Sequence, residues 1–285
     1  MITTYHRPKT LDEALTLLTQ SNRIPLGGGT LLSHTSSPFS ASRAADSIEV
    51  VDLQSLSLDS VKKNGNNLEL GATVTLQQLL ESDLCPEALK SALKLEAPLN
   101  IRNAATVAGT LVACDGRSTF TITLLALDAK LEIKSIDKFQ LVEMETESHP
   151  PKQHVDTLSL GDFLPLRTER VQGKLITSIS IPLNTKLAFE YVSRTPADKP
   201  IVCAALAQWN SGRTRLVLGG YGKNPALAMD GTEAEGTSTT DYILRSVQAA
   251  ARNTFHEATD EYASAEYRMD VAATLAKRCL ESLAQ

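Results

Sequence analysis

The hydrophobic positions in the first part of the chain predict one helix and two strands. Residues 10–13, Thr-Leu-Asp-Glu, have the form of a capping box, and apolar side chains recur at helical spacing from Leu11 onward. Short apolar segments at 24–26 and 48–53 predict two strands, separated by a polar, serine-rich crossing. The pattern predicts a small α/β subdomain over residues 1–56.

The next segment, residues 57–182, predicts a larger unit that mixes strands and helices. Residues 68–75 have strand character, and Thr75 is placed to cap a helix that follows. A proline suits the first turn of another helix at 86–95. Residues 137–157 are polar and hold two adjacent prolines, which predicts an exposed hairpin or loop. We therefore expect an α+β unit here.

The C-terminal part of the chain predicts a third unit, 183–285, which begins after a break marked by Pro182 and Asn184. Strands are expected at 201–209 and 214–219, and helices at 241–253 and 265–283. Strands come first and helices follow, which is typical of an α+β arrangement. The whole chain is therefore expected to be α+β.

Composition and charge exclude several classes of protein. A length of 285 residues suits two or three lobes, and 28 basic against 33 acidic residues give a formal net charge of −5. The basic residues are scattered, which argues against nucleic-acid binding. No apolar run approaches the roughly 20 residues of a membrane span, and the start lacks an apolar signal region. We expect no membrane partner and a cytoplasmic location.

The four cysteines lie far apart and form no Cys-x-x-Cys pair. They are Cys85, Cys114, Cys203 and Cys279. This spacing argues against an iron–sulfur cluster or a structural zinc held by this chain. The cysteines are expected to be small core residues in a reducing compartment.

Residues 26–32, Leu-Gly-Gly-Gly-Thr-Leu-Leu, are the first candidate ligand-binding segment. Three consecutive glycines leave backbone N–H groups uncovered, and such groups in a turn can form an anion-binding nest. A Walker A loop is excluded because Thr30 follows Gly29 with no lysine. A Rossmann fingerprint is excluded because Leu32 stands where the third glycine would be. A nucleotide would bind in another way, and a tight turn without a ligand is the alternative.

Residues 101–111 are the second candidate segment. Small side chains leave its backbone bare at Ala104, Ala105, Ala108 and Gly109. Thr106 and Thr110 add hydroxyl donors, a polar turn follows at 114–119, and an apolar helix is expected over 120–129. Two bare segments of this kind could clamp one diphosphate.

Both segments resemble those of a known family, the FAD-binding medium subunits of molybdenum hydroxylases such as xanthine dehydrogenase and carbon monoxide dehydrogenase. Residues 25–32 are similar to the family's Ala-Gly-Gly-Thr-Asp/Asn-Leu loop. Residues 101–111 are similar to its Ile-Arg-Asn-x-Ala-Thr-Ile-Gly-Gly-Asn-Leu segment. Further similar stretches lie at 124–129, 189–194, 217–220 and 264–268. The resemblance covers nearly the whole chain.

The resemblance implies two FAD-binding subdomains of the PCMH and CO dehydrogenase flavoprotein type, followed by a C-terminal domain with a small antiparallel sheet and helices. The implied cofactor contacts are Leu26, Gly27, Gly28, Gly29, Thr30, Leu31, Ala97, Thr106, Ala108, Gly109, Thr110, Thr119 and Tyr191. Five of these depart from the family pattern: Leu31 replaces a polar residue, Ala108 a glycine, Thr110 an Asn or Asp, Thr119 an Asp and Tyr191 a lysine. Each lost hydrogen bond would weaken binding by about 0.5–1.5 kcal/mol.

The resemblance also implies the function of an oxidoreductase subunit that binds FAD and has no catalytic residue of its own for the hydroxylation. A molybdenum cofactor would lie in a large partner subunit and two [2Fe–2S] clusters in a small one, forming a heterotrimer that could dimerise. Electrons would pass through this chain to an acceptor such as NAD or a quinone. Two alternatives stay open: an interaction subunit that has kept the fold and lost the flavin, and a standalone FAD oxidase.

Several single residues carry separate expectations. Arg117 is expected either to contact a phosphate or to be solvated. Trp209 ends an apolar strand and is expected in the core. Arg268, Lys277 and Arg278 are expected on a solvated face of the last helix.

Overall fold

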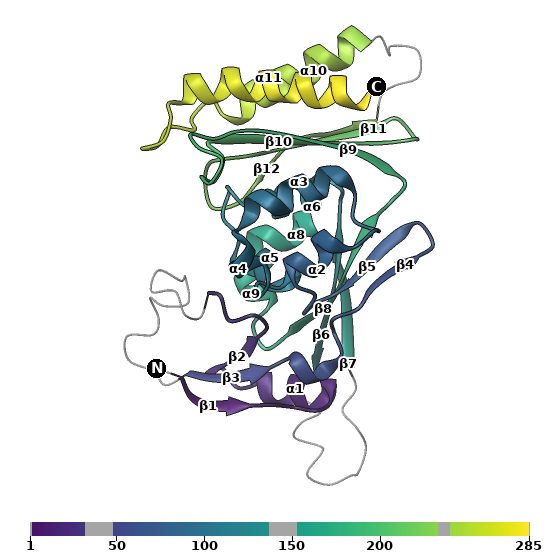
Figure 1. Ribbon diagram of the computed structural model, residues 1–285, viewed down its shortest axis with the longest axis vertical. Helices are drawn as coiled ribbons and strands as arrows, with labels where there is room; N and C mark the ends of the chain where they lie inside the picture. Colours follow the sequence, from purple (N-terminus) through teal and green to yellow (C-terminus); the bar gives the residue numbers. More distant parts are fainter. Residues whose placement is uncertain (1, 32–47, 137–152, 233–239, 285) are drawn as a thin grey trace.

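The computed structural model describes residues 2–31, 48–136, 153–232 and 240–284, which form three units along the long axis of the molecule (Figure 1). The N-terminal unit is a three-stranded sheet with one helix. The central unit is a five-stranded sheet with short helices, and the C-terminal unit is a four-stranded sheet with two long helices. The α+β fold that the sequence predicts is confirmed. The polar crossing expected after the glycine loop lies outside the described residues.

The N-terminal unit consists of three parallel strands and helix α1 (Leu11–Leu18). Strand β3 (Ile48–Asp52) lies between β1 (Ile2–His6) and β2 (Arg23–Leu26). The Thr10 hydroxyl caps α1 by accepting a hydrogen bond from the N–H three residues further on, at 3.2 Å. The predicted helix and two strands are confirmed. The sequence pattern missed β1 because four of its five side chains are exposed.

The central sheet is antiparallel, in the order β4-β5-β8-β6-β7. Its strands are β4 (Val61–Asn64), β5 (Asn67–Gly71), β6 (Lys130–Ile136), β7 (Gln153–Ser159) and β8 (Leu175–Pro182). Strand β7 pairs antiparallel with β6 and is mostly exposed, which agrees with the exposed hairpin or loop expected over 137–157 as far as residues 153–157 are concerned. Residues 137–152 lie outside the described ranges. β7 is an edge strand with no fully buried residue. Its pairing with β6 rests on backbone hydrogen bonds, which need no apolar pattern.

Seven short helices lie in the described part of the central unit. They are α2 (Leu76–Glu81), α3 (Glu87–Glu96), α4 (Leu99–Arg102), α5 (Val107–Ala113), α6 (Thr119–Ala126), α8 (Leu160–Phe163) and α9 (Arg167–Arg170), with 3₁₀ turns η2 (Gln54–Leu56) and η3 (Leu164–Leu166). The predicted cap at Thr75 is confirmed as a full capping box with Gln78. The bare segment expected at 101–111 is mostly helical, in α4 and α5, which corrects the sequence interpretation. Its small residues serve close packing rather than an open loop.

The C-terminal unit is an antiparallel sheet in the order β12-β11-β10-β9, covered on one face by two helices (Figure 1). Its elements are β9 (Thr185–Val192), β10 (Val202–Trp209), β11 (Arg213–Gly219), β12 (Ala226–Thr232), α10 (Thr240–Thr254) and α11 (Ala265–Leu283). The two predicted strands and two predicted helices are confirmed. Strand β12 was not predicted, since none of its residues is fully buried. Within the described ranges, no helix is long and apolar enough to cross a membrane.

Strand β10 lies between two hydrophobic cores. Cys203, Ala205 and Ala207 belong to the core of the central unit, together with the fully buried helix α6. Val202, Ala204 and Leu206 belong to the core beneath α10 and α11. Successive side chains of a strand point to opposite faces, so burial on both faces explains the unbroken apolar run. This strand joins the central and C-terminal units.

Arg268 does not lie on the solvated helix face that the sequence suggests. Its side chain is fully buried, with Nη2 2.8 Å from Asp260 Oδ1 and Nη1 donating to the Ala258 carbonyl oxygen at 2.6 Å. Most of its hydrogen-bond acceptors are backbone carbonyl oxygens of loops. The helical periodicity of the sequence gives no information on such contacts. Arg268 therefore fixes the loop before α11, whereas Lys277 and Arg278 are exposed as expected.

The four cysteines are buried and unpaired. Burial raises the pKa of each thiol, in the case of Cys85 to about 12. A thiol with a raised pKa is protonated near neutral pH and is a poor nucleophile or metal ligand. The expectation that these residues are small core residues is confirmed.

Candidate functional site

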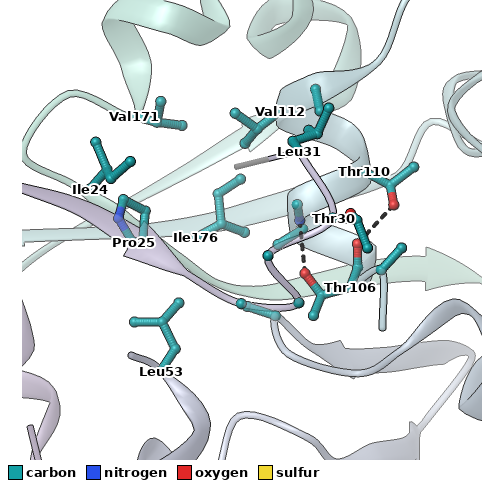
Figure 2. A pocket seen from close by; sticks show the side chains of 18 of the residues that line it. Ile24, Pro25, Thr30, Leu31, Leu53, Thr106, Thr110, Val112, Val171 and Ile176 are labelled. Atoms are coloured by element: carbon teal, nitrogen blue, oxygen red, sulfur yellow. Dashed lines mark hydrogen bonds between the residues drawn. The ribbon is translucent and has the colours of Figure 1, made fainter. Parts of the chain in front are cut away.

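A cleft of about 1070 Å³ lies between the N-terminal and central units. Its wall includes the glycine loop after β2, residues of α5, and the segment 171–176 that leads into β8 (Figure 2). Small-molecule sites measure about 300–1,000 Å³. The cleft therefore has room for a ligand as large as a dinucleotide.

The glycine loop makes backbone-to-backbone contact with the segment that leads into α5. A Cβ added to Gly28 would lie only 1.6 Å from the Ala104 carbonyl oxygen, so no other residue fits there without moving one segment. Gly29 has a φ of 70°, in the left-handed region that favours glycine. Among the described residues, no hydrogen bond from the amide of Gly27 or Gly28 is observed. Both residues line the cleft, and amides of this kind can bind an anionic group.

The N-terminal turn of α5 lies beside the glycine loop in the cleft wall. Thr106 is the N-cap, and its hydroxyl accepts a hydrogen bond from the Gly109 N–H at 3.2 Å. The Thr110 hydroxyl donates to the Thr106 carbonyl oxygen at 2.9 Å (Figure 2). The amides of Val107 and Ala108 donate to the carbonyl oxygens of residues 74 and 72. The first turn of α5 contributes shape to the cleft, while its amides are already used within the chain.

Apolar side chains cover much of the remaining cleft surface. Figure 2 shows them around the loop: Ile24, Pro25, Leu31, Leu53, Val112, Val171 and Ile176. Flat aromatic rings bind well to such surfaces because burying apolar area is favourable, at about 25 cal/mol per Å². Leu31, which departs from the polar residue implied by the resemblance, belongs to this apolar surface. The cleft thus combines unpaired amides with walls suited to ring systems.

Most charged side chains in the cleft wall are held in ion pairs. Arg23 Nε lies 2.6 Å from Glu49 Oε2, Lys174 Nζ 3.3 Å from Asp156 Oδ2, and Lys199 Nζ 3.1 Å from Asp115 Oδ2. Hydrogen bonds from His6 and Arg23 lower the pKa of the Glu49 carboxyl. The negative charge of Glu49 offsets that of Arg23, so this end of the cleft is only weakly positive.

Glu96 is a charged residue of the cleft wall that the sequence interpretation missed. It is the last residue of α3, and its Oε2 accepts a hydrogen bond from the Phe120 N–H at the start of α6, at 2.8 Å. The Ser118 hydroxyl lies 3.1 Å from Oε1 and 3.0 Å from Oε2. Burial raises the pKa of the Glu96 carboxyl, and the Phe120 N–H and Lys199 oppose this rise. A negative charge at the C-terminal end of a helix interacts unfavourably with the helix dipole. The position of Glu96 at the end of the predicted helix is therefore the sequence signal that could have identified it as a site residue.

The structure brings most of the expected site residues together. Ten of them line the cleft: Gly27, Gly28, Gly29, Thr30, Leu31, Ala97, Thr106, Ala108, Gly109 and Thr110. Leu26, Thr119 and Tyr191 are not part of its wall. The Thr119 hydroxyl is buried and donates to the Ala92 carbonyl oxygen at 2.7 Å. Tyr191 lies on β9, 38% exposed, with its ring stacked on Phe189.

Arg117 neither lines the cleft nor is simply solvated. Its Nε donates to the Pro200 carbonyl oxygen at 3.0 Å and its Nη2 to that of Lys199 at 2.9 Å. Its guanidinium group lies 4.1 Å from the centre of the Tyr262 ring. Arg117 therefore connects the turn before α6 to the C-terminal unit. The solvated role expected from the sequence is wrong, and the phosphate contact stays a prediction.

Comparison with known proteins matches both parts of the chain to described families. Residues 1–184 match the FAD binding domain in molybdopterin dehydrogenase, and residues 187–283 match the CO dehydrogenase flavoprotein C-terminal domain. The glyceraldehyde dehydrogenase medium chain of Sulfolobus acidocaldarius is 24% identical, with 98% of each chain covered. The carbon monoxide dehydrogenase medium chain of Afipia carboxidovorans is 25% identical, covering 97% of this chain and 95% of its own length.

The fold is shared with a solved structure of carbon monoxide dehydrogenase from Hydrogenophaga pseudoflava. The TM-score is 0.77 at 21% identity, with 99% of this chain and 97% of the other covered. The family matches span nearly the whole chain, and the cleft fits the cofactor that the first family is described as binding. The chain therefore belongs to the FAD-binding medium subunits of the molybdenum hydroxylase family, which are oxidoreductases with FAD as cofactor.

Proposed function

We propose that this chain binds FAD in the cleft between its N-terminal and central units and serves as the electron-transfer subunit of a molybdenum hydroxylase complex. The observation that carries the proposal is the meeting of the glycine loop with Ala104 at the edge of a cleft large enough for a dinucleotide. FAD supplies the capacity to accept and pass on electrons. This chain's own residues bind and orient it.

The cleft offers a different partner for each part of the cofactor. The amides of Gly27 and Gly28 suit the pyrophosphate, because the backbone can approach an anion closely where there is no side chain. Thr106, Ala108, Gly109 and Thr110 would form the part of the wall beside this loop. The apolar surfaces around Leu31 and Val171 suit the two ring systems. Leu26, Thr119 and Tyr191 do not line the cleft, so they would influence the cofactor through neighbouring residues.

The partners proposed for this chain are a molybdenum-cofactor large subunit and a small subunit with [2Fe–2S] clusters. Support comes from the relatives named as medium chains of carbon monoxide and glyceraldehyde dehydrogenases. Electrons would enter from the small subunit and leave to an external acceptor such as NAD or a quinone. The four unpaired cysteines favour a reducing, cytoplasmic location. We also propose that the three units are domains, with bounds 1–56, 57–182 and 183–285.

The absorbance spectrum of the purified chain, before and after incubation with FAD, tests cofactor binding. We expect retained flavin, or stoichiometric uptake after reconstitution. A chain that takes up no flavin under any reconstituting condition would favour the alternative of an interaction subunit that has lost its cofactor.

Co-purification tests the place of the chain in a complex. We expect a stable assembly with a molybdenum subunit and an iron–sulfur subunit. Turnover of a small substrate by this chain alone, with bound FAD and without partners, would overturn the subunit proposal in favour of a standalone oxidase.

A further inference from the structure

Glu96 differs from the other charged side chains in the cleft wall. Arg23, Asp115, Lys174 and Lys199 each form an ion pair. Glu96 forms none within the part of the chain that the structure describes. A partly buried carboxylate without a direct ion-pair partner is costly, so its presence in a ligand-binding cleft points to a role there.

Capping of α6 does not explain why the residue is acidic. The Ser118 hydroxyl already caps this helix by accepting a hydrogen bond from the Thr121 N–H at 3.3 Å. Glu96 adds one contact, to the Phe120 N–H, which a neutral acceptor could also make. A carboxylate at the C-terminal end of α3 also opposes that helix's dipole. The contacts of Glu96 within the chain therefore give little reason for a charge at this position.

The two carboxylate oxygens of Glu96 are used unequally. Oε2 accepts from the Phe120 N–H and lies 3.2 Å from the Thr119 hydroxyl. Among the described residues, Oε1 has a hydrogen bond only from the Ser118 hydroxyl, which it shares with Oε2 and with Thr121 Oγ1. A carboxylate has about four lone-pair sites, so Oε1 keeps capacity to accept another hydrogen bond. A hydroxyl group is the neutral donor that would use it.

We propose that Glu96 is a cofactor-binding residue whose carboxylate accepts a hydrogen bond from a sugar hydroxyl of FAD. The inference rests on FAD binding in this cleft. The ligand chemistry is that of a polyol, which FAD carries both in the ribityl chain and in the adenosine ribose. Phe120 and Ser118 orient the carboxylate.

The first test compares cofactor affinities of Glu96→Gln with those of the wild type. Glu87→Gln is the matched control, because Glu87 lies exposed on the same helix and forms an ion pair with the neighbouring Lys90. Fluorescence titration of the deflavinated chain should show FAD binding weakened about tenfold in Glu96→Gln, since hydrogen bonds to charged groups are the stronger ones. Glu87→Gln should bind as the wild type does.

Titration with FMN and with ADP separates the two sources of hydroxyls. A loss confined to FAD and FMN assigns the ribityl chain, and a loss confined to FAD and ADP assigns the ribose; either supports the proposal. Equal affinity of Glu96→Gln and wild type for FAD would overturn it. So would an equal loss for all three ligands, which indicates damage to the shared phosphate site. If the wild type itself binds no FAD, the proposed function fails first.

A pH profile of FAD affinity gives a second readout that a purely structural role would not change. A hydrogen bond to the carboxylate favours the ionised form, so affinity should fall as pH drops through the raised pKa of Glu96. Other titratable groups facing Glu96 are Lys199 and Cys203 of the C-terminal unit, and Cys114 and Asp115 before α6. Glu96→Gln should flatten the profile. A profile unchanged by this substitution would assign the titration to those neighbours and overturn the proposal.

Discussion

Gly28 has no side chain, and this allows the glycine loop to approach the backbone of Ala104 closely. A methyl group there would lie 1.6 Å from the Ala104 carbonyl oxygen. Ala104 and Ala105 are held in turn by backbone hydrogen bonds to Ile101. The glycine loop therefore packs against a backbone segment whose own hydrogen bonds resist displacement.

Gly28→Ala should consequently destabilise the chain and impair flavin binding together. Forcing the segments apart should lower the free energy of unfolding by about 1–3 kcal/mol. Denaturant unfolding measures the stability, and absorbance after incubation with FAD measures the cofactor. Gly231→Ala is the matched control, because a Cβ there meets nothing within 4 Å. Normal flavin content in Gly28→Ala would contradict this account of the cleft.

Single residues also show where sequence reasoning succeeds and where it fails. The glycine run and the alanines at 104–105 suggested bare backbone, and the structure joins the two segments as expected. Thr119 was expected at the cofactor on the basis of the resemblance, but it is not part of the cleft wall. The Glu96 carboxylate, 3.2 Å from the Thr119 hydroxyl, is part of that wall. Glu96 lies 23 residues earlier in the chain. Such a proximity is created by the packing of α3 on α6, which no local pattern encodes.

At the scale of elements, β10 packs into the hydrophobic cores of two units. Its odd-numbered residues, such as Ala205, pack on α6, and its even-numbered residues, such as Leu206, pack beneath α11. Arg117 adds a polar fastening between the same units through the carbonyl oxygens of Lys199 and Pro200. The C-terminal sheet thus supports the central unit that forms the cleft, although no residue of strands β9 to β12 is part of the cleft wall.

Leu206→Ala should reveal this coupling. Removal of a fully buried leucine side chain should lower the free energy of unfolding by about 2–5 kcal/mol. Leu227→Ala on β12, whose side chain is 44% exposed, should change it by less than about 0.5 kcal/mol. Urea denaturation followed by circular dichroism measures both. Similar losses in the two variants would contradict the assignment of β10 to the core.

The elements that could be predicted are those with a buried face and a local cap. Helices α1 and α2 have both, and β10 and β11 have long apolar runs. Strands β1, β7 and β12 have few or no buried side chains, so backbone pairing with a neighbouring strand positions them. Helix α5 was missed because its small residues allow close packing and give no amphipathic pattern. Its boundaries follow from tertiary contacts, such as the Val107 N–H to the Val74 carbonyl oxygen.

At the scale of the whole molecule, a ligand in the cleft would contact both the N-terminal and the central unit, whose sheets are separate. Binding to both walls should slow the opening of one unit away from the other. A ligand that binds only the folded state stabilises it by about 2.7 kcal/mol at a concentration of 100 times its Kd. The effect should be largest near the cleft and smallest in α10 and α11.

Hydrogen exchange with and without FAD measures this distribution. We expect slower exchange in β2 and in α5 on addition of FAD, and little change in α11, which lies on the far face of the C-terminal sheet (Figure 1). Gly28→Ala should show no slowing at the same FAD concentration. Protection confined to α10 and α11 would indicate binding elsewhere and contradict the location of the site.

The contact between Gly28 and Ala104 has a consequence for how such a protein can change over time. Because main chain meets main chain, the spacing of the two segments at this contact is set by backbone atoms and not by side-chain volume. A residue such as Leu31 can therefore be exchanged without altering this backbone contact. A lineage can thus retune the affinity or redox character of its bound cofactor by mutation at the rim while the architecture stays constant.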